Sequence, residues 1–138
     1  MSRKDTFHNI VRHALEKDGW TITHDPLLLR YELGNLYIDL GAEKVLAAER
    51  EGQKIAVEVK SFVQNSAVSE FHTALGQFIS YRMLLAEQYP EYVLYLAVPR
   101  DAFTSFFATQ LVQGIIHSQQ LKLIVYKPDK EAIDQWLN

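Results

Sequence analysis

Cysteine is absent from the sequence, which excludes disulfide bonds and metal sites built on thiolates. No apolar stretch approaches the ~18 consecutive residues that a membrane-spanning helix needs. Residues 1–8, MSRKDTFH, also lack the apolar core of a signal peptide. Together these absences favour a soluble, cytoplasmic protein that has no membrane partner.

The chain has no excess of positive charge, because its 14 lysines and arginines are outnumbered by 17 aspartates and glutamates. The net charge is −3 and the pI is about 5.9. A basic domain attracts nucleic acid through its overall field, and this chain does not. Any contact with DNA is therefore expected to be local or to depend on a partner.

Several catalytic and binding motifs are also missing. There is no Gly-rich phosphate loop, no Gly-x-Ser-x-Gly and no kinase-like set. The five histidines show no zinc-ligand spacing. The six glycines and four prolines are scattered, and no linker, repeat or low-complexity tract is visible. With 138 residues, 48% of them apolar, the chain is predicted to form one domain over residues 1–138.

Hydrophobic spacing predicts a succession of helices and strands. An amphipathic helix over 4–18 precedes a strand over 20–23, and the apolar triplet 27–29 is expected to fold onto the core as a loop or short helix. The other predicted elements are strands over 36–40, about 45–50, 54–60, 92–98 and 121–126, and helices over 67–88, 102–116 and 129–137. Residues 43–51 also have helical composition, but Gly52-Gln53 favours a hairpin. This order predicts an α/β sandwich with a mixed central sheet flanked by helices.

Two charged residues, Glu58 and Lys60, interrupt an otherwise apolar strand, KIAVEVK over 54–60. The alternation places both on the face opposite Ile55, Val57 and Val59. Burying a carboxylate and an ammonium costs of order several kcal/mol per ion. A metal site is one reason for a strand to carry them, and a solvated strand edge is the alternative.

Three further residues are candidates for the same site. Asp39 lies near the end of the strand predicted over 36–40, and its alternative role is a turn residue bonded to its own backbone before Gly41. Gln77 and Tyr81 are spaced i, i+4 on the helix predicted over 67–88, so they can face one site or form a surface pair.

This succession of elements resembles the PD-(D/E)xK nuclease-like superfamily. The shared pattern is an opening helix, a strand bearing an Asp, a hairpin into a strand bearing Glu-x-Lys, and then a helix. Gln77 and Tyr81 resemble the Gln-x-x-x-Tyr of exonuclease-like branches. The resemblance implies a restriction-endonuclease-like sandwich with a divalent metal at the sheet edge.

At finer detail, KDGWTITHDP (17–26), VEVKSF (57–62) and ALGQ (74–77) are similar to the XisH type of excision controlling factor, known from the cyanobacterial fdxN element. The likeness covers nearly the whole chain. It implies a part in site-specific excision of a DNA element during cell differentiation, with an XisI-type partner protein and a separate site-specific recombinase.

The chain departs from the superfamily pattern in two places. Asp39 is preceded by Ile38 instead of proline. Where resolvase-like members have an early Glu in the first helix, this chain offers Asp5, His8 or Glu16. The third acidic ligand therefore stays open.

The resemblance implies metal-assisted phosphodiester hydrolysis. Carboxylates of Asp39 and Glu58 suit Mg²⁺ or Mn²⁺, which would lower the pKa of a bound water. Lys60 would orient that water or offset developing charge, and Gln77 would hold the water or the phosphate. Contacts with the nucleic-acid backbone are expected from Lys44 and Arg82.

Other side chains receive smaller roles. The hairpin is expected to bring Glu49 near Glu58 as an accessory acid, with a surface salt bridge as the alternative. His8 and Arg12 are expected to face solvent on the first helix. FTSFFA (103–108) is more apolar than one helix face needs, so an exposed part is expected to serve a partner or a second copy in a homo-oligomer.

The sequence supports a magnesium-dependent endonuclease acting on DNA during excision. Its main alternative is a catalytically inactive module with a nuclease fold, which assembles a recombination complex through protein contacts. The acidic pI favours this alternative. A third reading is a restriction-like defence component.

Overall fold

The computed structural model describes residues 3–35, 45–63 and 66–138. Ten strands and helices form the main body: α1 (Arg3–Lys17), β1 (Thr21–His24), β4 (Val45–Arg50), β5 (Gln53–Val59), α3 (Ala67–Gln88), β6 (Tyr92–Pro99), α4 (Arg100–Thr104), α5 (Gln110–Gln119), β7 (Leu123–Lys127) and β8 (Ala132–Leu137). Short elements are β2 (Arg30–Tyr31), β3 (Gly34–Asn35), η1 (Phe106–Ala108) and η2 (Pro128–Lys130). Within these ranges, none of the helices has the length and apolar character to cross a membrane.

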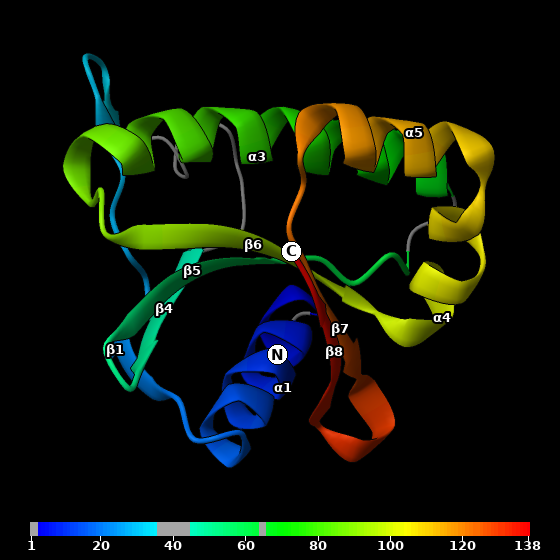
Figure 1. Ribbon diagram of the computed structural model, residues 1–138, viewed down its shortest axis with the longest axis horizontal. Helices are drawn as coiled ribbons and strands as arrows, with labels where there is room; N and C mark the ends of the chain where they lie inside the picture. The colour runs from blue at the N-terminus through cyan, green and yellow to red at the C-terminus, as the bar shows by residue number, and fades with distance from the viewer. Residues whose placement is uncertain (1–2, 36–44, 64–65) are drawn as a thin grey trace.

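A six-stranded sheet with the order β1-β4-β5-β6-β7-β8 forms the middle layer. The pairs β5–β6 and β6–β7 are parallel, and the other pairs are antiparallel. Figure 1 shows α3 and α5 side by side above the sheet and α1 below it. The α/β sandwich with a mixed sheet is therefore confirmed.

The two faces of β5 belong to separate cores. Ile55, Val57 and Val59 pack in the cluster that includes Val11 and Leu15 of α1. Ala56 of the other face packs in the cluster that includes Phe71, Phe78 and Tyr81 of α3. The predicted alternation is thus correct, and it places the Glu58 face against α3.

The turn between β4 and β5 fixes their register. Arg50 pairs with Gln53, so Glu51 and Gly52 form a two-residue loop in which both have positive φ, 51° and 83°. This turn suits the twist of antiparallel strands, and glycine accommodates it at no steric cost. The predicted hairpin is confirmed, and the helical alternative for 43–51 is wrong over the described residues of β4.

Helix α3 has the predicted bounds. Its N-cap is Ser66, whose side chain accepts a hydrogen bond from the Ser69 backbone N–H at 3.1 Å. It ends at Gln88, and the C-cap residue Tyr89 precedes Pro90, which disfavours helical geometry in the residue before it. Helix α1 and strands β1, β6 and β7 also match their predictions within about two residues.

The single helix predicted over 102–116 is wrong. It is divided into α4, η1 and α5, with Ser105 at φ −111°, ψ −85° and Thr109 in an extended conformation. The Ser105 hydroxyl donates to the Asp101 carbonyl at 2.6 Å, and the Thr109 hydroxyl donates to the Phe106 carbonyl at 2.8 Å. Such side-chain bonds compete with helix continuation.

The break turns Phe106 and Phe107 toward the core. The Phe107 ring lies 5.1 Å from that of Phe62 and 5.6 Å from that of Phe71, and Phe107 is fully buried. The run 103–108 therefore contributes to packing under α3. The expectation that an exposed part of this run serves a partner stays a prediction, and the fully buried Phe107 is not part of such a surface.

The closing helix predicted over 129–137 is also wrong. After η2, Glu131 has a φ of 46°, and residues 132–137 pair with β7 as the antiparallel strand β8. The Trp136 ring packs 5.5 Å from Trp20 and 5.1 Å from Tyr95. A free sheet edge and two aromatic neighbours outweigh local helix propensity.

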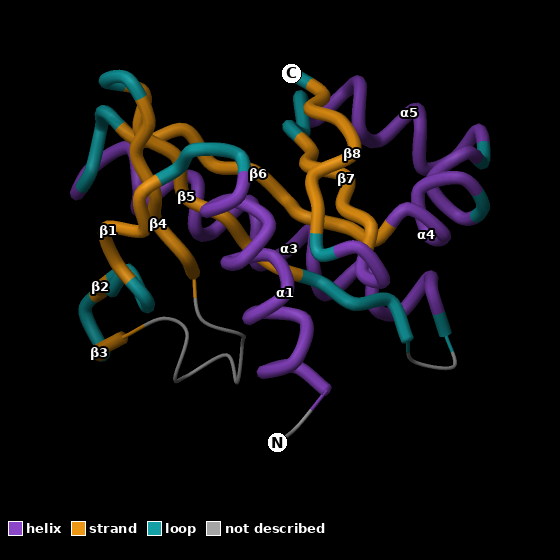
Figure 2. The backbone as a smooth tube through the Cα atoms, turned by 90° about the horizontal axis from the view of Figure 1, so that it is seen from below, coloured by secondary structure: helices purple, strands orange, loops and turns teal. Residues whose placement is uncertain are grey.

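Residues 24–35 lead from β1 into a small hairpin of β2 and β3. Figure 1 shows this hairpin in cyan beyond one end of α3, and Figures 1 and 2 both show it on the side of the molecule away from α4. The Arg30 backbone N–H donates to the Gln88 Oε1 at 3.0 Å there. Leu27 and Leu29 are buried, as expected, and the Leu27 backbone N–H donates to the Val45 carbonyl at 2.7 Å. The strand predicted over 36–40 lies outside the described residues.

Candidate active site

Glu58 lies in the middle of the sheet, near the carboxyl end of β5. Its Cα pairs with that of Val45 on β4 and that of Leu96 on β6. Only 1% of the residue is exposed. The expectation of a solvated strand edge is therefore wrong, because neighbouring strands flank Glu58 on both sides and α3 covers its face.

Lys60 follows β5 directly and is 5% exposed. Its backbone is held on two sides, since its N–H donates to the Ala97 carbonyl at 3.0 Å and its carbonyl accepts from the Tyr126 hydroxyl at 2.7 Å. Its ammonium lies 3.8 Å from a Glu58 carboxylate oxygen. The Glu-x-Lys pair is thus a buried ion pair on one face of the sheet.

Helix α3 supplies the third member of this cluster. The Lys60 ammonium donates to the Gln77 Oε1 at 2.7 Å, and Gln77 is 7% exposed. Tyr81, one turn further along, is fully buried on the same inner face of α3. The i, i+4 spacing therefore serves the interior, and the surface-pair alternative is wrong.

Glu70 is a nearby residue that the sequence did not single out. One of its carboxylate oxygens accepts a 2.6 Å hydrogen bond from the Phe62 backbone N–H, and Phe62 has a positive φ of 52°. This bond ties the loop after Lys60 to α3. Tyr126 was missed as well, because nothing in its local pattern reveals a bond to a residue 66 positions away.

Some predicted site residues lie outside the described part of the chain. Asp39 and Lys44 fall in residues 36–44, and the side chain of Asp5 is also outside it. Among the described residues, no group of three or more His, Cys, Asp or Glu side chains is arranged to hold a metal ion. Glu58 is the described carboxylate at the cluster, and its hard oxygens suit Mg²⁺ or Mn²⁺.

Two accessory acids lie away from the cluster. Glu49 pairs with Lys54, whereas Glu58 pairs with Val45, so the register separates the two acids by roughly 13 Å along the hairpin. The expected closeness of Glu49 and Glu58 is therefore wrong. Glu16 is exposed on α1, which covers the opposite face of the sheet.

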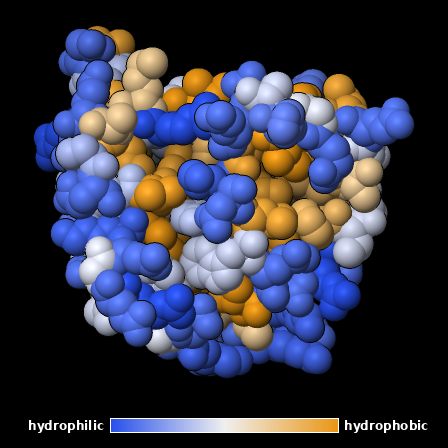
Figure 3. Space-filling view, in the orientation of Figure 1, coloured by the Kyte–Doolittle hydropathy of each residue, from blue (hydrophilic) through white to orange (hydrophobic). Residues whose placement is uncertain are grey.

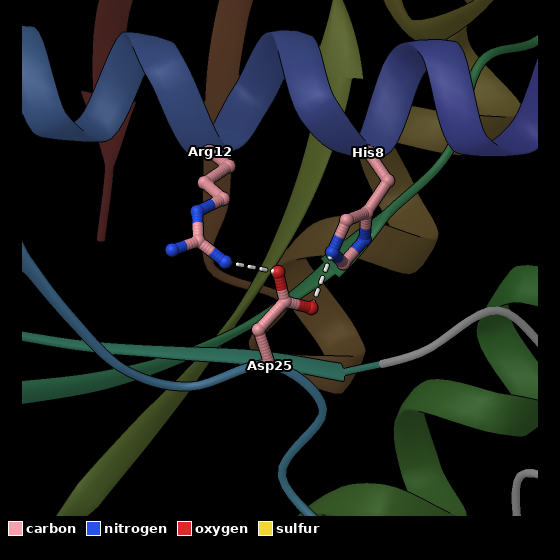
Figure 4. Close-up of polar contacts among 3 residues, drawn as sticks. All are labelled: His8, Arg12 and Asp25. Carbon is pink, nitrogen blue, oxygen red and sulfur yellow. Dashed lines mark hydrogen bonds and ion pairs between the residues drawn. The ribbon is translucent and has the colours of Figure 1, made fainter.

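His8 and Arg12 form a second polar cluster with Asp25 (Figure 4). The His8 Nε2 lies 2.6 Å from one Asp25 carboxylate oxygen, and an Arg12 guanidinium nitrogen donates to the other at 2.6 Å. The His8 side chain is 12% exposed. The solvent-facing placement is wrong for His8, whereas the Arg12 side chain is 40% exposed, and both residues bind Asp25 in the turn after β1. The Asp25-Pro26 pair predicted a turn at this position, but the sequence did not predict that Asp25 binds His8 and Arg12.

Arg82 lies on the α5 side of α3. Its guanidinium donates to the Gln119 carbonyl at 2.7 Å and lies 5.3 Å from the centre of the Phe78 ring. Cationic donors at a helix C-terminus satisfy carbonyls that have no partner within the helix. The described contacts of Arg82 therefore join α3 to the C-terminal end of α5.

Comparisons with known proteins show the family of this chain. The family model described as XisH protein matches residues 1–134. The chain belongs to the XisH family. A crystal structure of a fdxN element excision controlling factor protein from Anabaena variabilis is 52% identical, with a TM-score of 0.89, covering 97% of this chain and 99% of that one.

A second XisH family structure, from Nostoc punctiforme, is also 52% identical with a TM-score of 0.89, and the match covers 97% of this chain and 100% of that one. No curated protein matches the chain. The XisH resemblance drawn from KDGWTITHDP, VEVKSF and ALGQ is therefore confirmed. The fold is that of an XisH family chain.

Proposed function

We propose that this protein acts as an excision controlling factor in site-specific excision of a DNA element, and that it does so as a nuclease-like enzyme dependent on Mg²⁺ or Mn²⁺. The relative from Anabaena variabilis carries the first part of this function in its description. The observation that supports the second part is the buried cluster of Glu58, Lys60 and Gln77.

Stability alone is a weak reason for this cluster. Replacing a buried ion pair with apolar side chains of similar volume is often neutral or stabilising by about 1–4 kcal/mol. Here the ion pair lies in a strand whose other buried side chains are apolar. Strongly desolvated charged groups with a specific partner are typical of functional sites.

The proposed roles follow the chemistry of each side chain. Glu58 and Asp39 would hold the metal, and Asp39 precedes β4 in the sequence, the strand on which Val45 pairs with Glu58. The ion would polarise the scissile phosphate and acidify a bound water. Lys60 would place its positive charge beside the phosphate oxygens, and Gln77 would hold the Lys60 ammonium in position.

A module without catalysis is the second candidate function. The exposed fractions of Glu58 and Lys60, 1% and 5%, favour it, because a phosphodiester must reach these groups for hydrolysis. The net charge of −3 also favours recruitment to DNA through a partner. In both cases we propose an XisI-type protein and a separate recombinase as partners.

Calorimetry with Mn²⁺ tests the metal site. Wild type should bind Mn²⁺, and Glu58→Gln should abolish the heat while circular dichroism shows an unchanged fold. Glu49→Gln is the matched control, because it removes an acid from the adjoining strand outside the cluster. Absence of binding by wild type would support the non-catalytic module.

A nicking assay tests the reaction itself. Supercoiled and branched DNA should be cut in the presence of Mg²⁺ by wild type and not by Lys60→Met, provided that both proteins are folded. Equal cutting by the two proteins would show a contaminating nuclease and would contradict the assigned role of Lys60.

A further inference from the structure

A cavity lies on the α1 face of the sheet, at the end of β5 opposite Glu58. Its volume is about 440 Å³, within the ~300–1,000 Å³ range of small-ligand sites. It is lined by residues from the β4–β5 hairpin, the beginnings of β5 and β6, Trp20 after α1, and the end of the chain. No residue of the Glu58, Lys60 and Gln77 cluster lines it.

The walls of this cavity are aromatic. Trp20 and Trp136 have ring centroids 5.5 Å apart at 33°, and Tyr95 meets Trp136 edge-on at 5.1 Å and 88°. Trp136 and Tyr95 are partly buried, so part of each remains accessible. Val93, on the same face, is 40% exposed. Figure 3 shows apolar side chains reaching the surface over the middle of the face drawn there.

The charges around the cavity are already matched. The Arg50 guanidinium lies 4.8 Å from the Trp20 ring centroid and 3.4 Å from an Asp18 carboxylate oxygen. The Lys54 ammonium lies 3.9 Å from a Glu91 carboxylate oxygen. With each cation paired, the cavity favours a neutral planar group over a phosphate or carboxylate.

Hydrogen-bonding groups occur among the lining residues as well. Gln53 and Asn138 carry side-chain amides, and the Tyr95 hydroxyl donates to the Asn138 Oδ1. An amide offers a donor and an acceptor together, the combination that matches the edge of a nucleobase. Aromatic walls with amide groups are a common means of holding an unstacked base.

We propose that this cavity binds a nucleobase, either an unpaired base of a DNA strand or the base of a free nucleotide. The base lies against Trp136 and Tyr95, and its polar edge meets Gln53. The cavity is separate from the proposed metal site, so it would give the protein a contact with unpaired DNA that needs neither metal nor a basic surface.

Intrinsic fluorescence gives a direct test, because both tryptophans of the chain line the cavity. Titration with dAMP or dTMP should quench the emission saturably, whereas deoxyribose 5-phosphate, which lacks a base, should leave it unchanged. A duplex with one unpaired base and a fully paired duplex form the second arm. Quenching by the first duplex but not by mononucleotides assigns the cavity to an unpaired base in a strand.

Variants separate this site from other causes of quenching. Trp136→Leu should weaken base binding by roughly five- to a hundredfold, read from Trp20. Gln53→Ala, at an exposed position, should weaken binding without affecting the fold, and Leu111→Ala on α5 is the matched surface control. Glu58→Gln should bind the base as wild type does. The proposal is overturned by no saturable quenching with any base-containing probe, or by wild-type affinity in both Trp136→Leu and Gln53→Ala.

Discussion

The two faces of β5 are buried to the same degree but carry different side chains. Ile55, Val57 and Val59 face α1 and are 4%, 0% and 0% exposed, whereas Glu58 and Lys60 on the α3 side are 1% and 5% exposed. The α1 face is explained by the removal of apolar surface from water. The α3 face needs a partner for each charge, and Lys60 obtains two, Glu58 and Gln77.

This contrast shows that burial by itself does not distinguish a core from a site. What distinguishes them is the free energy that the same position would gain if it were apolar. On the α1 face the side chains are apolar, so burial stabilises the fold there. On the α3 face Glu58 and Lys60 occupy buried positions where apolar side chains would be as stable or more stable.

Removing one member of the ion pair should have the largest effect. Glu58→Ala leaves the Lys60 ammonium buried without its carboxylate, and we expect the free energy of unfolding to fall by about 3–5 kcal/mol. Ile55→Val, on the other face of β5, should cost about 0.5–1.5 kcal/mol. Urea unfolding followed by circular dichroism measures both. A Glu58→Ala cost no larger than that of Ile55→Val would erase the contrast between the faces.

Replacing both charges should reverse most of that loss. The double variant Glu58→Leu, Lys60→Met makes the α3 face apolar, and we expect its unfolding free energy to return to within about 1 kcal/mol of wild type or to exceed it. Mn²⁺ binding should stay absent. The single variant Lys60→Met is the control, because it has the same methionine but leaves the Glu58 carboxylate buried without its ammonium. A double variant as unstable as Glu58→Ala would show that the pair is required for folding.

The cluster of His8, Arg12 and Asp25 extends the comparison to partly exposed charges. The Asp25 side chain is 17% exposed and that of Arg12 is 40% exposed, so solvent screens their attraction. We expect Asp25→Asn to lower the unfolding free energy by about 0.5–1 kcal/mol in the same urea assay. Glu16→Gln, on the exposed side of α1, is the control. A decrease in unfolding free energy as large as that of Glu58→Ala would contradict the expectation that solvent weakens the attraction between Asp25 and its two cationic partners.

The smallest effect concerns Tyr95 on the α1 face. Burial raises the pKa of the Tyr95 hydroxyl above its ordinary value of 10.0. The unfolded chain therefore releases this proton first, and the stability present below pH 10 falls as the pH rises through the folded pKa. Unfolding at pH 9 and pH 11 should show a smaller decrease for Tyr95→Phe than for wild type. An equal decrease would assign the alkaline loss to other groups.

Local patterns predicted most of the fold. Alternation in 54–60, the Gly52 turn signal and the apolar stripe of 67–88 each depend on residues close in sequence, and each gave the right element. The failures lie at 102–116 and 129–137. There, hydroxyl side chains and the free edge of β7 decided the outcome, and neither can be weighed without the neighbouring elements.

The residues of the candidate site that depend on local sequence patterns could be predicted, and those that depend on distant contacts could not. Glu58 and Lys60 stand out because charge interrupts an apolar strand, and Gln77 has helical spacing to Tyr81. The bond of Tyr126 to the Lys60 carbonyl, and that of Glu70 to the Phe62 N–H, join segments whose distance only the fold sets. The prediction for Glu49 was wrong because the sequence indicated a hairpin but not its register, which sets the separation of Glu49 and Glu58 along the strands.

The sequence by itself determined which residues alternate, where the chain turns, and that two opposite charges share one face of β5. The tertiary structure alone decided that these charges are enclosed by β4, β6 and α3, that Gln77 holds Lys60, and that the last residues form a strand. The reason is that side-chain periodicity is a property of the local backbone, whereas burial and ion pairing depend on which distant segments pack together.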